Sequence, residues 1–254
     1  MYDSVNKVFD IGLGVIYKIR ETQCERIDTA GRMIAKAHME GHKFFVTGSG
    51  HSHTVAEEFY GRAGGLAFPV PIMTTELTLE EHPTKSSYIE RLTGYAAILG
   101  ELYGVGEGDV VLITSNSGRN AYPVEMALYA KEHGAKVIAV TSIDHSSKTS
   151  SRHASGKKLM DLADIVIDNC GVEGDSSLRI EGMKASIAPT SSMANAFIVQ
   201  SMVAACCEEM LKNGVEPPVF ISLNSDGNET VNDELFAKYS PRSEERFSRN
   251  AETD

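Results

Sequence analysis

Hydrophobic positions at helical spacing fill the first forty residues. Apolar side chains recur three or four positions apart between Val5 and Ala37, which is the repeat of one face of an α-helix. Gly12 and Gly14 interrupt this pattern. We therefore predict an N-terminal helical extension over residues 1–40, broken near the two glycines.

From residue 43 onward the pattern changes to short, mostly apolar runs that end in turn-forming residues. They cover residues 44–47, 68–73, 110–114, 137–141 and 165–167. Continuous rather than alternating apolarity is typical of strands that are buried on both faces of a parallel sheet.

Helical patterns lie between these strands, at residues 54–64, 88–103, 121–133 and 156–163, and a longer one follows at 191–213. Strands that alternate with helices predict an α/β sandwich with a mainly parallel sheet and right-handed crossovers.

The chain turns polar near its end. Residues 240–254 have too little apolar content to fold alone. We predict one α/β domain over residues 41–225 and a polar C-terminal tail over 226–254.

Composition narrows the class of protein. With 254 residues, of which 42% are hydrophobic, the chain can build one core of ordinary size. Its 24 basic and 35 acidic residues give a net charge of −11, which argues against nucleic acid as a partner. No apolar run approaches the roughly 18 residues of a membrane helix, so we expect a cytoplasmic protein without membrane contact. The four cysteines have no Cys-x-x-Cys spacing, which leaves structural zinc and redox catalysis unsupported.

Two loops carry the candidate chemistry. Gly-Ser-Gly-His-Ser-His follows the first strand at residues 48–53, and Ser-Asn-Ser-Gly-Arg-Asn follows the third at 115–120. Each precedes a predicted helix, whose free amides favour an anion. The first loop lacks the third glycine of a dinucleotide-binding fingerprint, and the chain has no P-loop. Either loop alone is also compatible with a plain tight turn.

Together these loops resemble the sugar loops of the SIS (sugar isomerase) domain. The resemblance extends through residues 137–142, 162–167 and 189–192 and covers roughly residues 30–215. Segments 115–120, 152–158 and 214–220 are similar to a bacterial subgroup labelled, by inference, as phosphoheptose isomerases.

The resemblance implies a flavodoxin-like three-layer sandwich with a five-stranded parallel sheet of order 2-1-3-4-5. In that order both loops open into one crevice at the carboxyl edge of the sheet. It also implies a homodimer or homotetramer.

The resemblance further implies a phosphorylated sugar as ligand, and it assigns binding residues. These are Gly48, Ser49, Gly50, Ser52 and His53 in the first loop, Ser115, Asn116, Ser117, Gly118, Arg119 and Asn120 in the second, and Ser191 and Ser192 at the start of the last long helix. Asn120 departs from the family's usual threonine, although its amide can still donate a hydrogen bond. Arg119 is equally compatible with a solvated surface position.

A catalytic base is harder to assign. Isomerisation needs a group that removes the proton next to a carbonyl. Where related enzymes have a catalytic glutamate, an ungapped alignment places Arg62. Glu58 lies one turn earlier on the same helix face and can substitute, although the two also suit an ordinary surface ion pair. Glu81 and His51 are further candidates.

The spacing of His51 and His53 permits a metal ion, but no acidic or cysteine ligand is adjacent in sequence. We therefore expect neither metal nor cofactor. The sequence predicts a phosphosugar-binding protein that acts as an aldose–ketose isomerase. Two alternatives stay open: a noncatalytic phosphosugar sensor, and a sugar-phosphate etherase or lyase.

Overall fold

The computed structural model describes residues 2–222 and 229–239. Its centre is a parallel sheet with the predicted strand order β2-β1-β3-β4-β5. The α/β class and the sheet order expected from the sequence are confirmed. The strands are β1 (Phe44–Gly48), β2 (Val70–Ile72), β3 (Val110–Thr114), β4 (Lys136–Thr141) and β5 (Ile165–Asp168).

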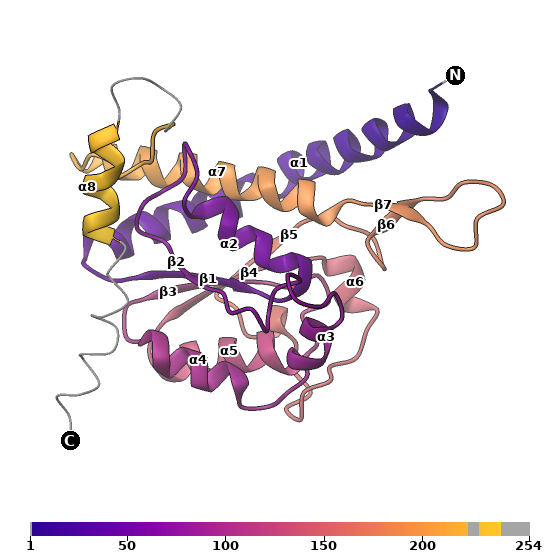
Figure 1. Cartoon of the computed structure of the whole chain (residues 1–254), viewed down its shortest axis with the longest axis horizontal. Coiled ribbons are helices and arrows are strands. Elements are labelled where there is room, and N and C mark those ends of the chain that lie inside the picture. Colours follow the sequence, from indigo (N-terminus) through magenta and orange to yellow (C-terminus); the bar gives the residue numbers. More distant parts are fainter. Residues whose placement is uncertain (1, 223–228, 240–254) are drawn as a thin grey trace.

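Helices cover both faces of the sheet, and Figure 1 shows the three layers. They are α1 (Asp3–Met39), α2 (Thr54–Phe59), α3 (Lys85–Ile89), α4 (Tyr95–Tyr103), α5 (Ala121–Glu132), α6 (Ile143–Ser147) and α7 (Ser191–Lys212), with α8 (Glu229–Tyr239) near the end of the chain.

Successive residues of a strand pack against the helices on opposite faces of the sheet, because side chains alternate from one face to the other. Phe44 and Val46 of β1 join the core cluster beneath α1, α2 and α7. Phe45 joins the cluster beneath α4 and α5. This two-sided burial explains why apolar residues run on continuously along the strands instead of alternating with polar ones. It also places α2 and α5, which follow the two candidate loops, on opposite faces.

Helix α1 runs without a break through both glycines, in contrast to the interruption expected there. Packing explains the difference, because α1 lies along α7 in parallel orientation. Gly12 lies against Met193 near the start of α7, and Gly31 against Ala205 further along it. Arg32 forms an ion pair with Glu209 near its end. Tertiary contact therefore outweighs the low helix propensity of glycine.

Other boundaries also differ from the expected ones. Helix α2 ends at Phe59 rather than near residue 64. The helix expected over residues 88–103 is two helices, α3 and α4, separated at Gly94, whose φ is +85°. In place of the helix expected at 156–163 there is a 3-10 turn, Leu159–Asp161.

Several elements were not predicted. The short helix α6 follows β4, and an antiparallel hairpin of β6 (Ser176–Leu178) and β7 (Ile187–Pro189) precedes α7. Helix α8 lies within the predicted polar tail, whose last part, residues 240–254, lies outside the described residues. Within the described ranges, no helix is long and apolar enough to cross a membrane.

Candidate functional site

The first loop turns sharply after β1. A side chain at Gly48 would meet the Ser52 backbone at 2.6 Å, so only glycine fits this approach. Gly50 has a φ of +58°, and its amide donates to the Leu77 carbonyl at 2.8 Å. The loop is thereby fixed against the segment that follows β2. His51 is exposed, whereas His53 is buried.

The second loop leaves several hydrogen-bond donors unused. The Gly118 amide donates to Ser115 Oγ at 3.1 Å, and the Gly118 φ of +58° shapes the turn. The amides of Ser117, Arg119 and Asn120, and the Ser117 hydroxyl, donate to no other group in the described part of the chain. Donors of this kind between a strand and a helix start form a concave anion site.

Glu90 joins the two loops. Ser49 Oγ of the first loop donates to Glu90 Oε2 at 2.6 Å. Asn120 Nδ2 of the second loop donates to Glu90 Oε1 at 2.7 Å. The Glu90 backbone carbonyl also accepts a hydrogen bond from the Tyr122 amide at the start of α5, at 2.9 Å. The structure therefore brings the two sequence-predicted loops together, with a carboxylate between them.

Burial raises the pKa of the Glu90 carboxyl above its ordinary value. The Ser49 hydrogen bond and the charges of Arg91 and Arg152 act in the opposite direction. A carboxylate with a raised pKa is a stronger base than an ordinary one, which favours proton removal from carbon.

Three arginines lie in or near the second loop. Arg152 donates to Asn120 Oδ1 at 3.0 Å, and its amide donates to the Arg119 carbonyl at 2.8 Å. Burial, followed by the charges of Arg119 and Arg91, lowers the pKa of Arg152. The buried Arg119 Nε has no hydrogen-bond partner among the described residues. Mutual repulsion between these cations favours a bound anion.

Polar contacts extend from the second loop toward α7. Asn169 Nδ2 donates to Asn116 Oδ1 at 2.7 Å and lies 3.2 Å from Asn195 Oδ1 on α7. The Asn116 carbonyl accepts from the Ser142 amide at 3.1 Å. These contacts fix the carboxyl ends of β3, β4 and β5 relative to one another.

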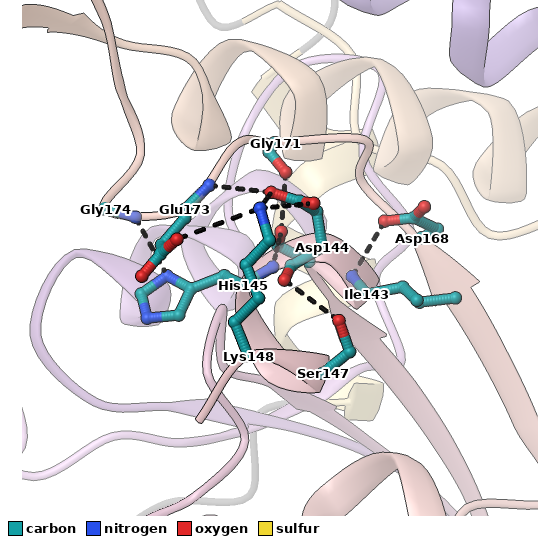
Figure 2. A network of polar contacts seen from close by, with 10 residues as sticks. Ile143, Asp144, His145, Ser147, Lys148, Asp168, Gly171, Glu173 and Gly174 are labelled. Atoms are coloured by element: carbon teal, nitrogen blue, oxygen red, sulfur yellow. Dashed lines mark hydrogen bonds and ion pairs between the residues drawn. The ribbon is translucent and has the colours of Figure 1, made fainter. Parts of the chain in front are cut away.

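A second polar network, drawn in Figure 2, holds the loop after β5 against α6. Asp144 accepts from the Glu173 amide at 3.0 Å and from Lys148, whose hydrogen bond lowers the pKa of Asp144. The His145 Nδ1 accepts from the Gly174 amide at 3.4 Å. This network orders the loop after β5 at the carboxyl edge of the sheet.

Ser191 is already engaged. Its hydroxyl donates to Asp175 Oδ2 at 2.6 Å, and its amide donates to Asp175 Oδ1 at 2.9 Å. Asp175 thus places a negative charge at the N-terminus of α7, where it is favourable. Ser192 is exposed. An anion that used both serines would have to displace Asp175.

Of the predicted catalytic residues, His51 is an exposed residue of the first loop, whereas Glu58 and Glu81 lie apart from the contact between the loops. Glu58 forms an ion pair with Arg62 and accepts from Gln200 of α7 at 3.1 Å. Glu81 is exposed and pairs with Lys85. Among the described residues, neither glutamate is hydrogen-bonded to the second loop.

Sequence reasoning did not find Glu90 or single out the Arg152 side chain. Glu90 falls inside a stretch that was expected to be one continuous helix, where a charged residue suggests a solvated face. The signal in the sequence was the Thr93-Gly94 pair, which marks the helix break. A cluster of possible metal ligands also lies at the first loop, and it consists of His53, Glu57 and Glu80.

Comparisons with known proteins agree with this architecture. A family model described as the SIS domain matches residues 11–142. A UPF0309 protein of Halalkalibacterium halodurans is 44% identical over 225 residues, covering 89% of this chain and 93% of that protein. One from Caldanaerobacter subterraneus is 44% identical over 230 residues, with coverages of 89% and 94%.

Among solved structures, phosphoheptose isomerase GmhA from Neisseria gonorrhoeae superimposes with a TM-score of 0.54. It is 18% identical, and the match covers 82% of this chain and 97% of that one. At this identity the likeness concerns the fold.

Proposed function

The chain belongs to the SIS domain family and is related to the UPF0309 proteins, and from this premise we propose a function. The protein binds a phosphorylated sugar and interconverts the aldose and ketose forms of that sugar. One observation carries the proposal. Unused donors of the second loop lie beside a half-buried carboxylate that is hydrogen-bonded to both loops. An anion site and a proton-transfer group in one crevice are what such a reaction requires.

The phosphate binds to the second loop. The amides of Ser117 and Arg119 and the Ser117 hydroxyl donate to its oxygens, while the nearby arginines supply positive charge. Hydrogen bonds to a charged group contribute more than neutral ones. Binding at the phosphate then holds the carbonyl end of the sugar in place for reaction.

Glu90 is the proton-transfer group in this proposal. Its carboxylate takes the proton from the carbon next to the carbonyl and returns it to the neighbouring carbon, while the hydroxyl proton moves between the two oxygens. Ser49 and Asn120 orient the carboxylate through their hydrogen bonds. Glu90 replaces Glu58 as the preferred base, because Glu58 is paired with Arg62.

Exchange of substrate hydrogen with solvent tests this assignment. The protein is incubated in heavy water with a panel of phosphorylated hexoses, heptoses and amino sugars, and deuterium incorporation is followed. Glu90→Gln keeps the shape of the site but removes the base, so we expect exchange to fall by about 100-fold or more. Glu58→Gln, the matched carboxylate-to-amide control, should retain it. If only Glu58→Gln lost exchange, Glu58 rather than Glu90 would be the base.

The sensor alternative has its own support. Arg62 stands where related enzymes have glutamate, and it is neutralised by Glu58. Binding of a sugar phosphate without exchange in the wild-type protein would establish the sensor. Exchange accompanied by loss of a substituent from the sugar would instead identify an etherase or lyase.

The proposed assembly is a homodimer or homotetramer. A groove of 540 Å³ between α1 and α7 is lined by residues that include Ile16, Tyr17 and Phe197. Four large side chains, Val5, Phe9, Leu13 and Tyr17, lie exposed along one face of α1. Exposed apolar surface of this kind marks a contact with another chain.

A further inference from the structure

A second polar cluster lies at the first loop and has no part in the proposed proton transfer. It consists of His53 at the end of the 3-10 turn after β1, Glu57 on α2 and Glu80 in the segment after β2. One ligand atom from each residue lies within 4.8 Å of the other two. Residues from three separate parts of the chain therefore converge on one point.

The imidazole of His53 is held in a defined orientation. Its side chain is 8% exposed, and its Nδ1 lies against the Gly50 carbonyl. Because a carbonyl accepts and does not donate, the Nδ1 carries the proton. In the neutral ring the Nε2 then carries a lone pair, which faces Glu57 Oε1 at 3.2 Å. A backbone carbonyl on the second ring nitrogen is the usual support of a metal-binding histidine.

Apart from the contact between Glu57 and His53, the two glutamates have no basic partner among the described residues. Their neighbours in sequence, Glu58 and Glu81, form ion pairs with Arg62 and Lys85 respectively. Within residues 2–222 and 229–239, Glu57 and Glu80 form no ion pair with lysine or arginine. In each adjacent pair, one carboxylate is neutralised and the other contributes to the cluster around His53. A proton on His53 would balance only one of the two carboxylates, whereas a divalent cation would balance both and bind all three groups.

We propose that His53, Glu57 and Glu80 bind a divalent transition-metal ion of the zinc, cobalt and manganese type. One imidazole and two carboxylates suit these ions. With metal–ligand bonds of about 2.1 Å, neighbouring ligand atoms of a tetrahedral site lie about 3.4 Å apart. The separation between His53 and Glu57 matches this spacing, and Glu80, which is exposed, moves inward on binding.

Three protein ligands leave a coordination position for water or for an oxygen of a bound molecule. The site adjoins the first loop, so that oxygen is a hydroxyl or carbonyl of whatever the loop holds. The proposal goes beyond the proposed function and does not depend on it, because the metal site consists entirely of protein groups. From the sequence we expected no metal, because no acidic or cysteine ligand directly adjoins His51 and His53; Glu80 comes from a separate segment.

Metal titration of the full-length chain tests the site without any sugar. Cobalt(II) binding is followed by its visible absorption, and zinc binding is followed by competition with a chelator. We expect one ion per wild-type chain. Glu80→Gln, an exposed substitution that preserves the fold, should weaken binding by about 10-fold or more. Glu81→Gln, the adjacent control, should leave the affinity within about twofold.

Two results would overturn the site: no saturable binding by the wild-type chain, or equal weakening by Glu80→Gln and Glu81→Gln. His53→Gln adds a second check, since it removes the only nitrogen ligand. Its far-ultraviolet circular dichroism is recorded in parallel, and Glu80→Gln alone decides the outcome if that spectrum changes. Failure of metal binding leaves the exchange experiment on Glu90 unaffected, so the two proposals fail separately.

Discussion

Ser117 is the residue whose removal most directly tests anion binding. Its hydroxyl has no partner within the described chain, so Ser117→Ala costs the free protein little. We expect the variant to bind a sugar phosphate more weakly by about 1 to 3 kcal/mol, because it loses a hydrogen bond to a charged group. Calorimetry measures the change. Ser147→Ala on α6 is the control, since that hydroxyl bonds the Asp144 carbonyl. Equal affinities for wild type and Ser117→Ala would show that the second loop does not bind the phosphate.

Glu90 should leave a signature in the pH dependence of stability. Burial raises its pKa in the folded chain, so its contribution to the free energy of unfolding is greatest below the unfolded pKa of about 4.3. That contribution declines as pH rises through the folded pKa. Glutamine keeps both hydrogen bonds, because its oxygen accepts from Asn120 and its amide donates to Ser49.

Glu90→Gln should therefore gain stability relative to wild type as pH is raised from about 5 to about 8. Urea unfolding at several pH values within that range measures the difference. A variant that is less active yet more stable at high pH would fit a strained functional carboxylate. A difference that stays constant with pH would show that Glu90 does not change its ionisation on folding.

At the scale of elements, the contact between α1 and α7 depends on a missing side chain. A Cβ at Gly31 would lie 2.6 Å from Ala205 Cβ and 2.7 Å from the Met202 carbonyl oxygen. Gly31→Ala must push the helices apart, and we expect a loss of about 1 to 3 kcal/mol in the free energy of unfolding.

Gly14 supplies the matched control for this prediction. It lies on the same helix, but a Cβ there meets nothing within 4 Å. Gly14→Ala should be neutral or stabilise by up to about 1 kcal/mol, since alanine favours the helix. Denaturant unfolding compares both variants with wild type. If both substitutions had the same effect, helix propensity rather than packing would govern this element.

The sequence predicted elements well where a local pattern carried the information. Continuous apolar runs such as the one ending at Thr114 identified the strands, because burial on both faces favours apolar residues at successive positions. The break expected at Gly12 was wrong, because α1 is supported there by packing against Met193 of α7, a helix far away in the sequence. The two loops were found from their composition. Glu90 was not, because its role depends on how the segment after β2 folds back between them.

At the scale of the whole molecule, the N-terminal part of α1 carries an apolar surface that nothing in the described chain covers. The N-terminal part of α1 extends beyond the sheet layers in Figure 1, on the same side as the β6–β7 hairpin. Val5, Phe9, Leu13 and Tyr17 recur every four residues along it and are about half exposed or more. An isolated stretch of helix gains little stability from propensity alone. A second chain packed against this stripe would supply the missing burial.

Charges placed on this stripe should weaken the proposed assembly. Phe9→Glu combined with Leu13→Glu sets two carboxylates where an interface would exclude water, and we expect the association constant to fall by at least about 100-fold. Sedimentation equilibrium measures the mass of the assembly across a concentration series. Leu211→Glu is the control: that side chain is 57% exposed but lies at the other end of α7. A wild-type chain that remains a monomer throughout the series, or a double variant that associates as strongly as Leu211→Glu, would exclude the α1 stripe as the interface.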